Sequence, residues 1–401
     1  MNKQEQVLSL SEKYYQTIKD ARRWLHQHPE TAFQEFETAA FICKFLDENQ
    51  IDYKRGIAKT GIVGIIQGQQ PHKRTLAIRA DMDALEIDEE NKVPYKSLNS
   101  GMMHACGHDV HMASLMGTIL ILNEIKDRFT GSVKFIFQPS EEKNPGGASV
   151  MIDEGVLENP KVEKIFGQHV FPELEVGKVG FRSGKYMAST DEIYLDIMAN
   201  GGHGGIPNKL IDTVLIASHI VVALQQIVSR NANPLMPSVL SFGKFIANGQ
   251  TNIIPSRVQI AGTMRTFDEN WRKEMHQHIR RMASGIAESM GGSCKVEISH
   301  GYPFVDNNVD LTQRAQLNAE ELLGKENVVD LDMRMTGEDF GFYSQKIPAC
   351  FYRLGTANVQ NNISSNLHTS SFDVDEESLK TGMALMSWLT IKELDFLESN
   401  K

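Results

Sequence analysis

Hydrophobic residues recur at helical spacing near the start of the chain and gather into short blocks further along. Residues 5–28 and 35–50 have the period of amphipathic helices, and Pro29 ends the first of them. Four short apolar blocks predict buried strands: 61–68, 75–85, 131–142 and 162–170. Residues 113–127 are almost continuously apolar, which indicates a largely buried helix. Because helices and strands alternate, we expect an α/β domain with a largely parallel sheet.

The pattern changes at about residue 187, where a second run of elements begins. Its segments follow the order β-α-β-β-α-β: 191–201, 211–230, 238–249, 257–267, 269–291 and 294–302. This order is that of the ferredoxin-like split unit, which is complete in itself. We therefore expect an inserted domain at residues 187–303, and an α/β domain formed by residues 1–186 and 304–401. The α/β pattern resumes after the insertion in three segments: 311–324, 349–356 and 375–397.

Composition and charge narrow the class of protein. The chain has 401 residues, which is more than one ordinary core holds, and 41% of them are apolar. A formal net charge of −10 argues against nucleic acid or an anionic membrane as a partner. We find no apolar signal core, and the apolar stretches are too short or too interrupted to span a bilayer. Because the four cysteines lie far apart, we expect a reduced, cytoplasmic protein.

Six side chains with metal-binding or proton-transfer chemistry lie near strand ends, at the start of a helix or in a late loop: Cys106, His108, Glu141, Glu142, His169 and His368. Loops beyond the carboxyl ends of strands converge on one crevice, so we expect these side chains to lie together. They exceed the needs of one tetrahedral ion and suit two neighbouring divalent ions. Taken singly, each has a structural interpretation, because strand-end histidines are commonly hydrogen-bonded and adjacent glutamates commonly solvated. We expect His104 and His111 to be structural, because their neighbours already supply close ligands.

Ten motifs, spread in order over nearly the whole chain, resemble those of one enzyme family. They are RRWLHQHPE, AIRADMDAL, MHACGHDVHMA, FIFQPSEE, GGASVMIDEG, GQHV, ANGGHGGIPN, TNIIPSRVQIAGTMRTF, MTGEDFGFY and LHTSSFDVDEESL. The chain resembles the metal-dependent amidohydrolases of the aminoacylase and carboxypeptidase superfamily. Within that superfamily it is most similar to N-acyl-amino-acid amidohydrolases, hippurate hydrolases and auxin–amino-acid conjugate hydrolases. The resemblance implies a zinc-peptidase-like fold with a mixed, largely parallel sheet flanked by helices, and an inserted ferredoxin-like lid and dimerisation domain.

The resemblance also implies a role for each residue of the candidate site. The metal ligands of the family correspond to five positions in this sequence: Cys106, His108, Glu142, His169 and His368. Glu141 corresponds to the general base. In related subgroups a histidine and an aspartate stand at the positions of Arg79 and Asp81; arginine cannot ligate, so Cys106 would supply the missing ligand. Two divalent ions per subunit are implied, with zinc favoured by the thiolate and manganese, cobalt or nickel as alternatives.

The inserted domain contributes three further residues by resemblance. His203, in the turn NGGHGG, corresponds to a donor to the oxyanion that acts in the active site of the partner subunit. A homodimer joined through the inserted domains is therefore implied, or a larger assembly built on it. Asn252 and Arg265 lie in segments similar to substrate-contacting ones, and an arginine suits a free carboxylate. Without the resemblance, the turn around His203 would be interpreted as a flexible loop.

We therefore predict an enzyme that hydrolyses the amide bond of N-acyl-amino acids, such as N-acetyl or N-benzoyl conjugates. A metal-activated water would attack the amide, and Glu141 would act as the general base. An aminopeptidase, a dipeptidase or an N-acetyldiaminopimelate-type deacetylase of the same superfamily is the nearest alternative. A metal-independent cysteine hydrolase that uses Cys106 is a more distant one. A non-catalytic metal-binding protein would not need the base, which is present.

Overall fold

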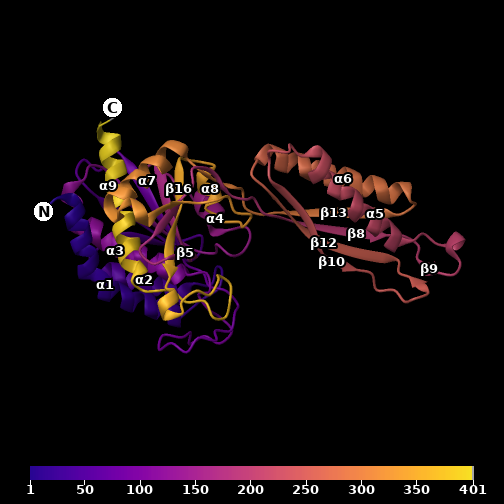
Figure 1. Cartoon of the computed structure of the whole chain (residues 1–401), viewed down its shortest axis with the longest axis horizontal. Coiled ribbons are helices and arrows are strands. Elements are labelled where there is room, and N and C mark those ends of the chain that lie inside the picture. The colour runs from indigo at the N-terminus through magenta and orange to yellow at the C-terminus, as the bar shows by residue number, and fades with distance from the viewer. Residues whose placement is uncertain (400–401) are drawn as a thin grey trace. The chain divides into compact units, whose positions relative to one another are not determined.

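The chain folds into two compact units in a computed structural model that describes residues 1–399 (Figure 1). The first unit comprises Met1–Gly184, Asp306–Asp332 and the described residues from Phe342 onward. The second comprises Lys185–Val305 and Met333–Gly341. The segment 333–341 thus lies in the second unit, although it falls within the stretch 304–401 that the sequence analysis assigned to the α/β domain.

The first unit is built on a mixed, mostly parallel sheet of eight strands in the order β1-β2-β4-β3-β5-β16-β6-β15. The strands are β1 (Tyr53–Ile57), β2 (Gly61–Gln67), β3 (Thr75–Asp81), β4 (Ser132–Gln138), β5 (Lys164–Glu175), β6 (Val179–Phe181), β15 (Val328–Asp330) and β16 (Ala349–Ala357). The central strands β4, β3, β5 and β16 run parallel to one another. At the two sides of this group, β2 pairs with β4 and β6 pairs with β16, and both pairs are antiparallel. All residues of β3, β4 and β16 are buried, as expected for strands covered on both faces.

Helices flank this sheet, and the most deeply buried of them, α3, begins at a residue of the candidate site. The helices are α1 (Lys3–Gln27), α2 (Phe36–Glu48), α3 (His108–Glu124), α4 (Gly147–Asp153), α7 (Val309–Leu323), α8 (Gly341–Ser344) and α9 (Ser378–Ser399). Every side chain of α3 from His108 to Leu122 is buried. Helix α3 packs against α1, α9 and strand β3. An apolar helix of this kind is held rigidly on all sides, so the residues at its first turn have fixed positions.

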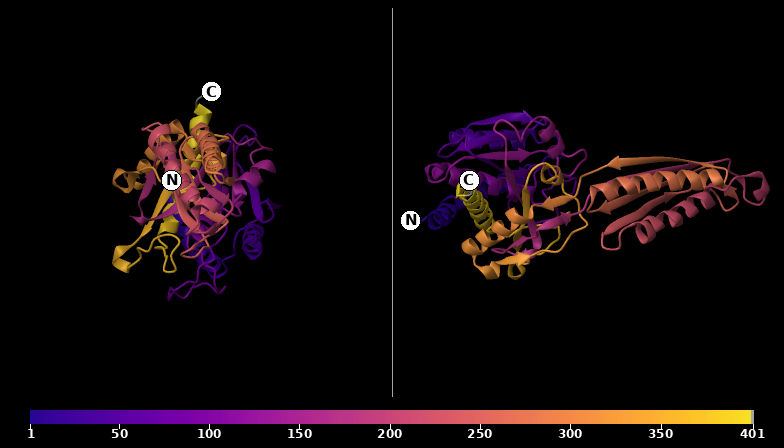
Figure 2. Two further views of the ribbon diagram at one scale, coloured as in Figure 1. Left: turned by 90° about the vertical axis from the view of Figure 1, so that its right-hand side faces the viewer. Right: turned by 90° about the horizontal axis from the view of Figure 1, so that it is seen from above.

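The second unit contains a four-stranded antiparallel sheet with two helices on one face (Figures 1 and 2). Its main elements follow one another as β8 (Asp191–Met198), α5 (Thr213–Gln226), β10 (Ser238–Ile246), β12 (Arg257–Thr266), α6 (Glu269–Ser289) and β13 (Ser293–His300). The strand order is β10-β12-β8-β13. Buried residues alternate with more exposed ones along β8, because only one face of this sheet is covered. Four short strands complete the fold: β7 (Gly184–Met187), β9 (Gly202–His203), β11 (Ile253–Ile254) and β14 (Val305–Asn307).

Helix α5 continues into a turn of π-helix, Ile227–Asn231. Together they form a segment of 19 residues, Thr213–Asn231, in which a window of 18 residues has a mean hydropathy of 1.4. By length and composition alone, this segment is long and apolar enough to cross a membrane. Ile216, Ile220 and Leu224 of this helix belong to the hydrophobic core of the second unit. One face of the helix is therefore a core face, whereas its opposite face stays open to solvent.

Candidate metal centre

The candidate site lies at the carboxyl ends of the central parallel strands of the first unit. Asp81 ends β3, and β4 ends at Gln138, with two residues between it and the glutamate pair. Strand β5 pairs with β3 as far as Gly167, and His169 lies just beyond that last pair. Because the carboxyl ends of parallel strands share one edge of a sheet, loops distant in sequence converge there.

The five predicted ligands lie together. We call Cys106, His108, Glu142, His169 and His368 the metal centre. Cys106 Sγ is 3.4 Å from His169 Nε2 and 3.4 Å from His368 Nε2. His368 Nε2 is 3.2 Å from a carboxylate oxygen of Glu142. The ligand atoms form two groups, each within 4.8 Å: Cys106 with His108 and His169, and Cys106 with Glu142 and His368. Cys106 belongs to both groups, which suits two adjacent ions.

Two imidazoles of the metal centre, those of His108 and His169, are oriented by hydrogen bonds at Nδ1. His108 Nδ1 donates to the backbone carbonyl of Asp83 at 2.7 Å, and His169 Nδ1 donates to that of Val170 at 2.8 Å. Nε2 of each ring is thereby left to face the centre. Among the described residues, His108 Nε2 is buried and has no hydrogen-bond partner. A buried ring nitrogen that has no hydrogen-bond partner, on a ring fixed by a carbonyl at its far side, fits a metal ligand.

His111 and Arg79 have structural roles beside the metal centre. His111 Nδ1 is 2.6 Å from a carboxylate oxygen of Asp81, and His111 Nε2 accepts the Val170 N–H at 2.8 Å. Both ring nitrogens are thus occupied. Arg79 donates to the other oxygen of Asp81 at 2.6 Å and to the side chain of Gln138 at 2.9 Å. Arg79 therefore anchors Asp81 from the position at which related subgroups carry a histidine.

The electrostatics of the metal centre favour a bound cation. Burial, with the charges of Glu142 and Glu141 close by, raises the pKa of the Cys106 thiol well above its usual value. Burial alone would lower the pKa of His108, but the charge of Asp81 and the hydrogen bond and charge of Asp83 outweigh it and raise that pKa to about 10. The His108 shift reflects negative charge in a buried space, and the Cys106 shift reflects burial first and the same negative charge second. A divalent ion relieves this negative charge and converts the thiol to a thiolate ligand.

The glutamate pair is held through its backbone by Asp83. The N–H groups of Glu141 and Glu142 donate to the two carboxylate oxygens of Asp83, each at 2.9 Å. Glu141 is 6% exposed, and one of its carboxylate oxygens lies within 4.8 Å of ligand atoms of His108 and Glu142. The sequence analysis gave Asp83 no role. Its one signal was a second acidic residue just after the end of β3, in the motif RADMDAL.

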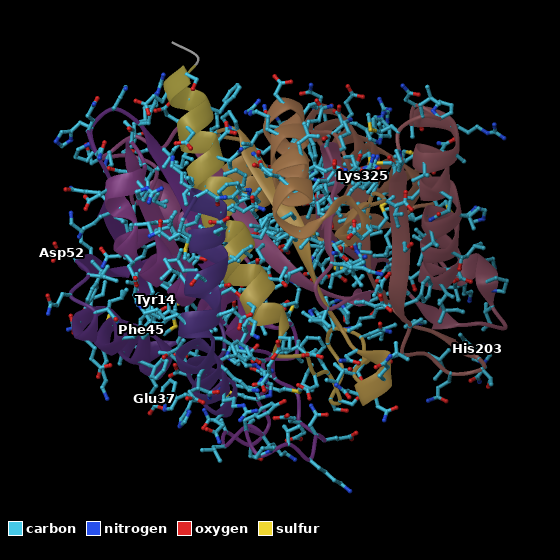
Figure 3. All side chains as sticks on the ribbon, turned by 60° about the vertical axis from the view of Figure 1, so that its left-hand side comes forward. Tyr14, Glu37, Phe45, Asp52, His203 and Lys325 are labelled. Carbon is cyan, nitrogen blue, oxygen red and sulfur yellow. The ribbon has the colours of Figure 1, made fainter. Side chains whose placement is uncertain are left out.

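The three residues predicted in the insertion lie in the second unit. His203 is exposed on β9 (Figure 3), where it pairs with Ile253 on β11. The carbonyl of Asn252 accepts the Gly204 N–H at 2.8 Å, so Asn252 lies beside this two-stranded pair. The His203 ring is exposed, and its Nδ1 accepts the Gly205 N–H at 3.0 Å, which leaves Nε2 outward. Arg265 is on β12, opposite Val239 of β10, and burial lowers the pKa of its guanidinium.

Replacing the shared thiol tests the metal centre directly. We expect Cys106→Ser to lower the bound metal from roughly two ions per chain to one or fewer, because both groups lose their common ligand. Cys350→Ser is the matched control, since Cys350 is also buried but lies on β16 outside the metal centre. Elemental analysis after dialysis against a divalent metal would measure both variants. Equal metal content in the two would contradict the assignment.

Residues 77–391 match the sequence profile of the peptidase family M20/M25/M40. An N-acyl-L-amino acid amidohydrolase of Geobacillus stearothermophilus is 43% identical over 71% of this chain and 76% of its own. An N-acetylcysteine deacetylase of Bacillus subtilis is 38% identical over 96% of this chain and 99% of its own. The crystal structure of Bacillus subtilis YxeP, described as a dinuclear metal-binding peptidase from the M20 family, superposes with a TM-score of 0.81 at 34% identity, covering 96% and 99% of the two chains. This chain therefore belongs to the peptidase family M20/M25/M40 and is a hydrolase of that family.

Proposed function

We propose that this chain hydrolyses the amide bond of N-acyl-amino acids with two divalent metal ions. The observation that carries the proposal is the pair of ligand groups that share Cys106, because together they contain all five members of the metal centre. Relatives that align over most of this chain are named as deacetylases or amidohydrolases of acylated amino acids. We also propose zinc as the native metal, because a thiolate among imidazoles suits it, and the cytoplasm as the location of the protein.

In this proposal Glu141 is the general base and the neighbouring glutamate is a ligand. Ions bound at the metal centre would act as Lewis acids that acidify a water molecule and polarise the amide carbonyl. Glu141 would accept the proton of the attacking water and return it to the nitrogen of the leaving amine. Its backbone N–H is anchored on Asp83 and its side chain is nearly enclosed, so few orientations are open to its carboxylate.

We propose that the second unit is a ferredoxin-like lid through which two copies of the chain dimerise. Its element order and its strand order both suit that fold. The side of α5 away from the sheet exposes Leu215 (49%) and Val222 (73%), and the edge strand β10 exposes Phe245 (44%). An apolar helix side and an unpaired strand edge are surfaces that self-association would cover. In the dimer, His203 of one copy would stabilise the oxyanion in the other, with Asn252 and Arg265 contacting the substrate.

A cysteine hydrolase is a weaker proposal, although Cys106 Sγ lies 3.4 Å from His169 Nε2. A nucleophilic cysteine needs a lowered thiol pKa and a histidine that can take its proton. Here burial raises the pKa of Cys106, and burial together with Arg353 lowers the pKa of His169. Both shifts oppose a thiolate–imidazolium pair.

A substrate panel tests the proposed reaction. We expect hydrolysis of N-acetyl-, N-benzoyl- or indole-acetyl-amino acids in preference to unblocked dipeptides. A chelator should abolish this activity and zinc, manganese or cobalt should restore it, because the ions supply the Lewis acid. Cleavage of unblocked dipeptides alone would favour an aminopeptidase or dipeptidase. Activity that resists the chelator but is lost on thiol alkylation would favour the cysteine hydrolase.

The base is tested by Glu141→Gln. This variant should keep its metal content but lose several orders of magnitude in kcat, because the amide cannot accept the proton while the geometry survives. Glu142→Ala is the comparison, and it should lower metal content instead. Measurements of kcat and elemental analysis on the same preparations separate the two roles. Near-normal turnover of Glu141→Gln would show that another group is the base.

The action of His203 across the dimer is tested by mixing subunits. His203→Ala should lower kcat on the order of a hundred- to a thousandfold and leave metal content unchanged, because one oxyanion donor is lost. Mixed with Glu141→Gln subunits, it should recover about a quarter of wild-type activity, since half of randomly formed dimers hold one complete site. Exchange of subunits should be followed by mass spectrometry. Exchange without recovery would place His203 in its own subunit's site or outside catalysis.

A further inference from the structure

Two buried carboxylates, from distant parts of the first unit, accept three consecutive backbone N–H groups around the glutamate pair. Glu35 accepts the N–H of Ser140 at 2.9 Å, and Asp83 accepts those of the next two residues at 2.9 Å each. Glu35 and Asp83 are 0% and 1% exposed. The loop that carries the glutamate pair is thus fixed by side chains that precede α2 and follow β3, and not by a regular ladder of backbone hydrogen bonds.

Glu35 is itself held on three sides. The oxygen that accepts from Ser140 also accepts the N–H of Phe33 at 2.9 Å. The other oxygen accepts the hydroxyl of Thr60 at 2.6 Å, and Thr60 is 3% exposed. Movement of Glu35 away from Ser140 would therefore also remove the acceptor of the buried Thr60 hydroxyl and of the partly buried Phe33 N–H, which is costly.

The loop needs such a restraint because its backbone is strained. Ser140 has a φ of 51°, in the left-handed region that residues other than glycine rarely adopt. The carbonyl of Ser140 accepts the Gly147 N–H at 2.8 Å, and a Cβ atom on Gly147 would lie 1.8 Å from the carbonyl oxygen of Pro139. The chain thus turns sharply directly before Glu141. Relaxing Ser140 towards an ordinary φ would change the direction in which the next residue leaves β4.

A contribution to stability does not explain why a glutamate is buried at position 35. Burial, with the charge of Asp83 nearby, raises the pKa of Glu35 to about 7. A raised pKa of a carboxyl group means that the folded state disfavours its ionised form, so the ionised group destabilises the fold as the pH rises above its usual value. A costly buried group next to strained backbone is more often kept for function than for stability.

We propose that Glu35 is a positioning residue that aims the carboxylate of Glu141 by holding the N–H of Ser140. The proposal rests on the assignment of Glu141 as the base. Asp83 holds the backbone of the ligand Glu142, whereas Glu35 contacts neither glutamate of the pair. Loss of Glu35 should therefore disturb proton transfer and spare the metal, and loss of Asp83 should affect both.

Three substitutions at Glu35 distinguish the effect of side-chain length from the effect of charge. Glu35→Ala should lower kcat by roughly tenfold to a hundredfold, with KM and metal content unchanged, because a small misplacement of a reacting group is that costly. Glu35→Gln should stay near wild type, since its amide oxygen can still accept from Ser140 and Phe33 and its nitrogen can donate to Thr60. Glu35→Asp keeps the charge but is one methylene too short, so it should be impaired.

Hydrogen exchange provides a readout that does not depend on activity. In the metal-free protein, a peptide spanning residues 139–143 should exchange on the order of tenfold faster in Glu35→Ala than in wild type, and at the wild-type rate in Glu35→Gln. Glu30→Ala is the matched control. Glu30 accepts the N–H groups of Glu37 and Thr38 at 3.1 and 2.8 Å in the first turn of α2 and has no bond to the loop. It should leave both kcat and this exchange unchanged.

Four results would overturn the proposal: wild-type kcat in Glu35→Ala, unchanged exchange in that variant, a fall in metal content that matches the fall in kcat, or an active Glu35→Asp beside an impaired Glu35→Gln. The last pattern would mean that activity depends on the charge at position 35 and not on the length of the side chain. If Glu35→Ala does not fold, the contrast between Glu35→Asp and Glu35→Gln decides alone. Full activity of Glu141→Gln would refute the assignment of the base, whereas the exchange rates test the restraint of the loop independently.

Discussion

The central strands of the first unit end at one edge of the sheet, where their loops bring carboxylates, imidazoles and a thiol, most of them buried, close to one another. Such groups repel one another when they are buried together, and the protein's own cations offset only part of the charge, as Arg79 does for Asp81. The raised pKa of His108 results from the negative charges of Asp81 and Asp83. The raised pKa of Cys106 results from burial and, in second place, from the charges of Glu142 and Glu141. A cation supplied from outside resolves both, so the need for metal follows from the way the sheet brings its loops together.

Rigid surroundings keep this cluster from relaxing by moving apart. His108 and Asp109 open α3, the helix that is buried on every side. Asp109 accepts from Arg22 and is paired with His26, each at 2.7 Å, which ties the first turn of α3 to α1. The motif RRWLHQHPE contains both partners. It thus supports the first turn of α3 but supplies none of the five members of the metal centre. Positions fixed in this way let a small set of side chains hold unfavourable charge close together.

The sequence predicts much of this arrangement because the relevant signals are local. Apolar blocks followed by polar, metal-type side chains mark where strands end, and parallel strands must end at one edge, which accounts for the convergence of Cys106 and His169. An apolar block does not indicate the direction of its strand, so the antiparallel pairing of β2 with β4 and of β6 with β16 could not be predicted. The short edge strands β1 and β15 have too few apolar residues to form a pattern. Segment 333–341 joins the second unit through tertiary packing, which local periodicity does not report.

Glu35 and Asp83, which the sequence analysis overlooked, share one property: both accept backbone N–H groups of the loop that carries the glutamate pair. A glutamate that precedes a helix, as Glu35 does, is usually interpreted as favourable charge near the helix N-terminus. One of its actual partners, the N–H of Ser140, is 105 residues away, in a loop where Ser140 itself has a positive φ. Hydrophobic pattern, residue type and spacing cannot predict such a bond. Side chains with metal-binding or proton-transfer chemistry can therefore be predicted from sequence, whereas side chains that hold the backbone beside them become visible only once the backbone is known.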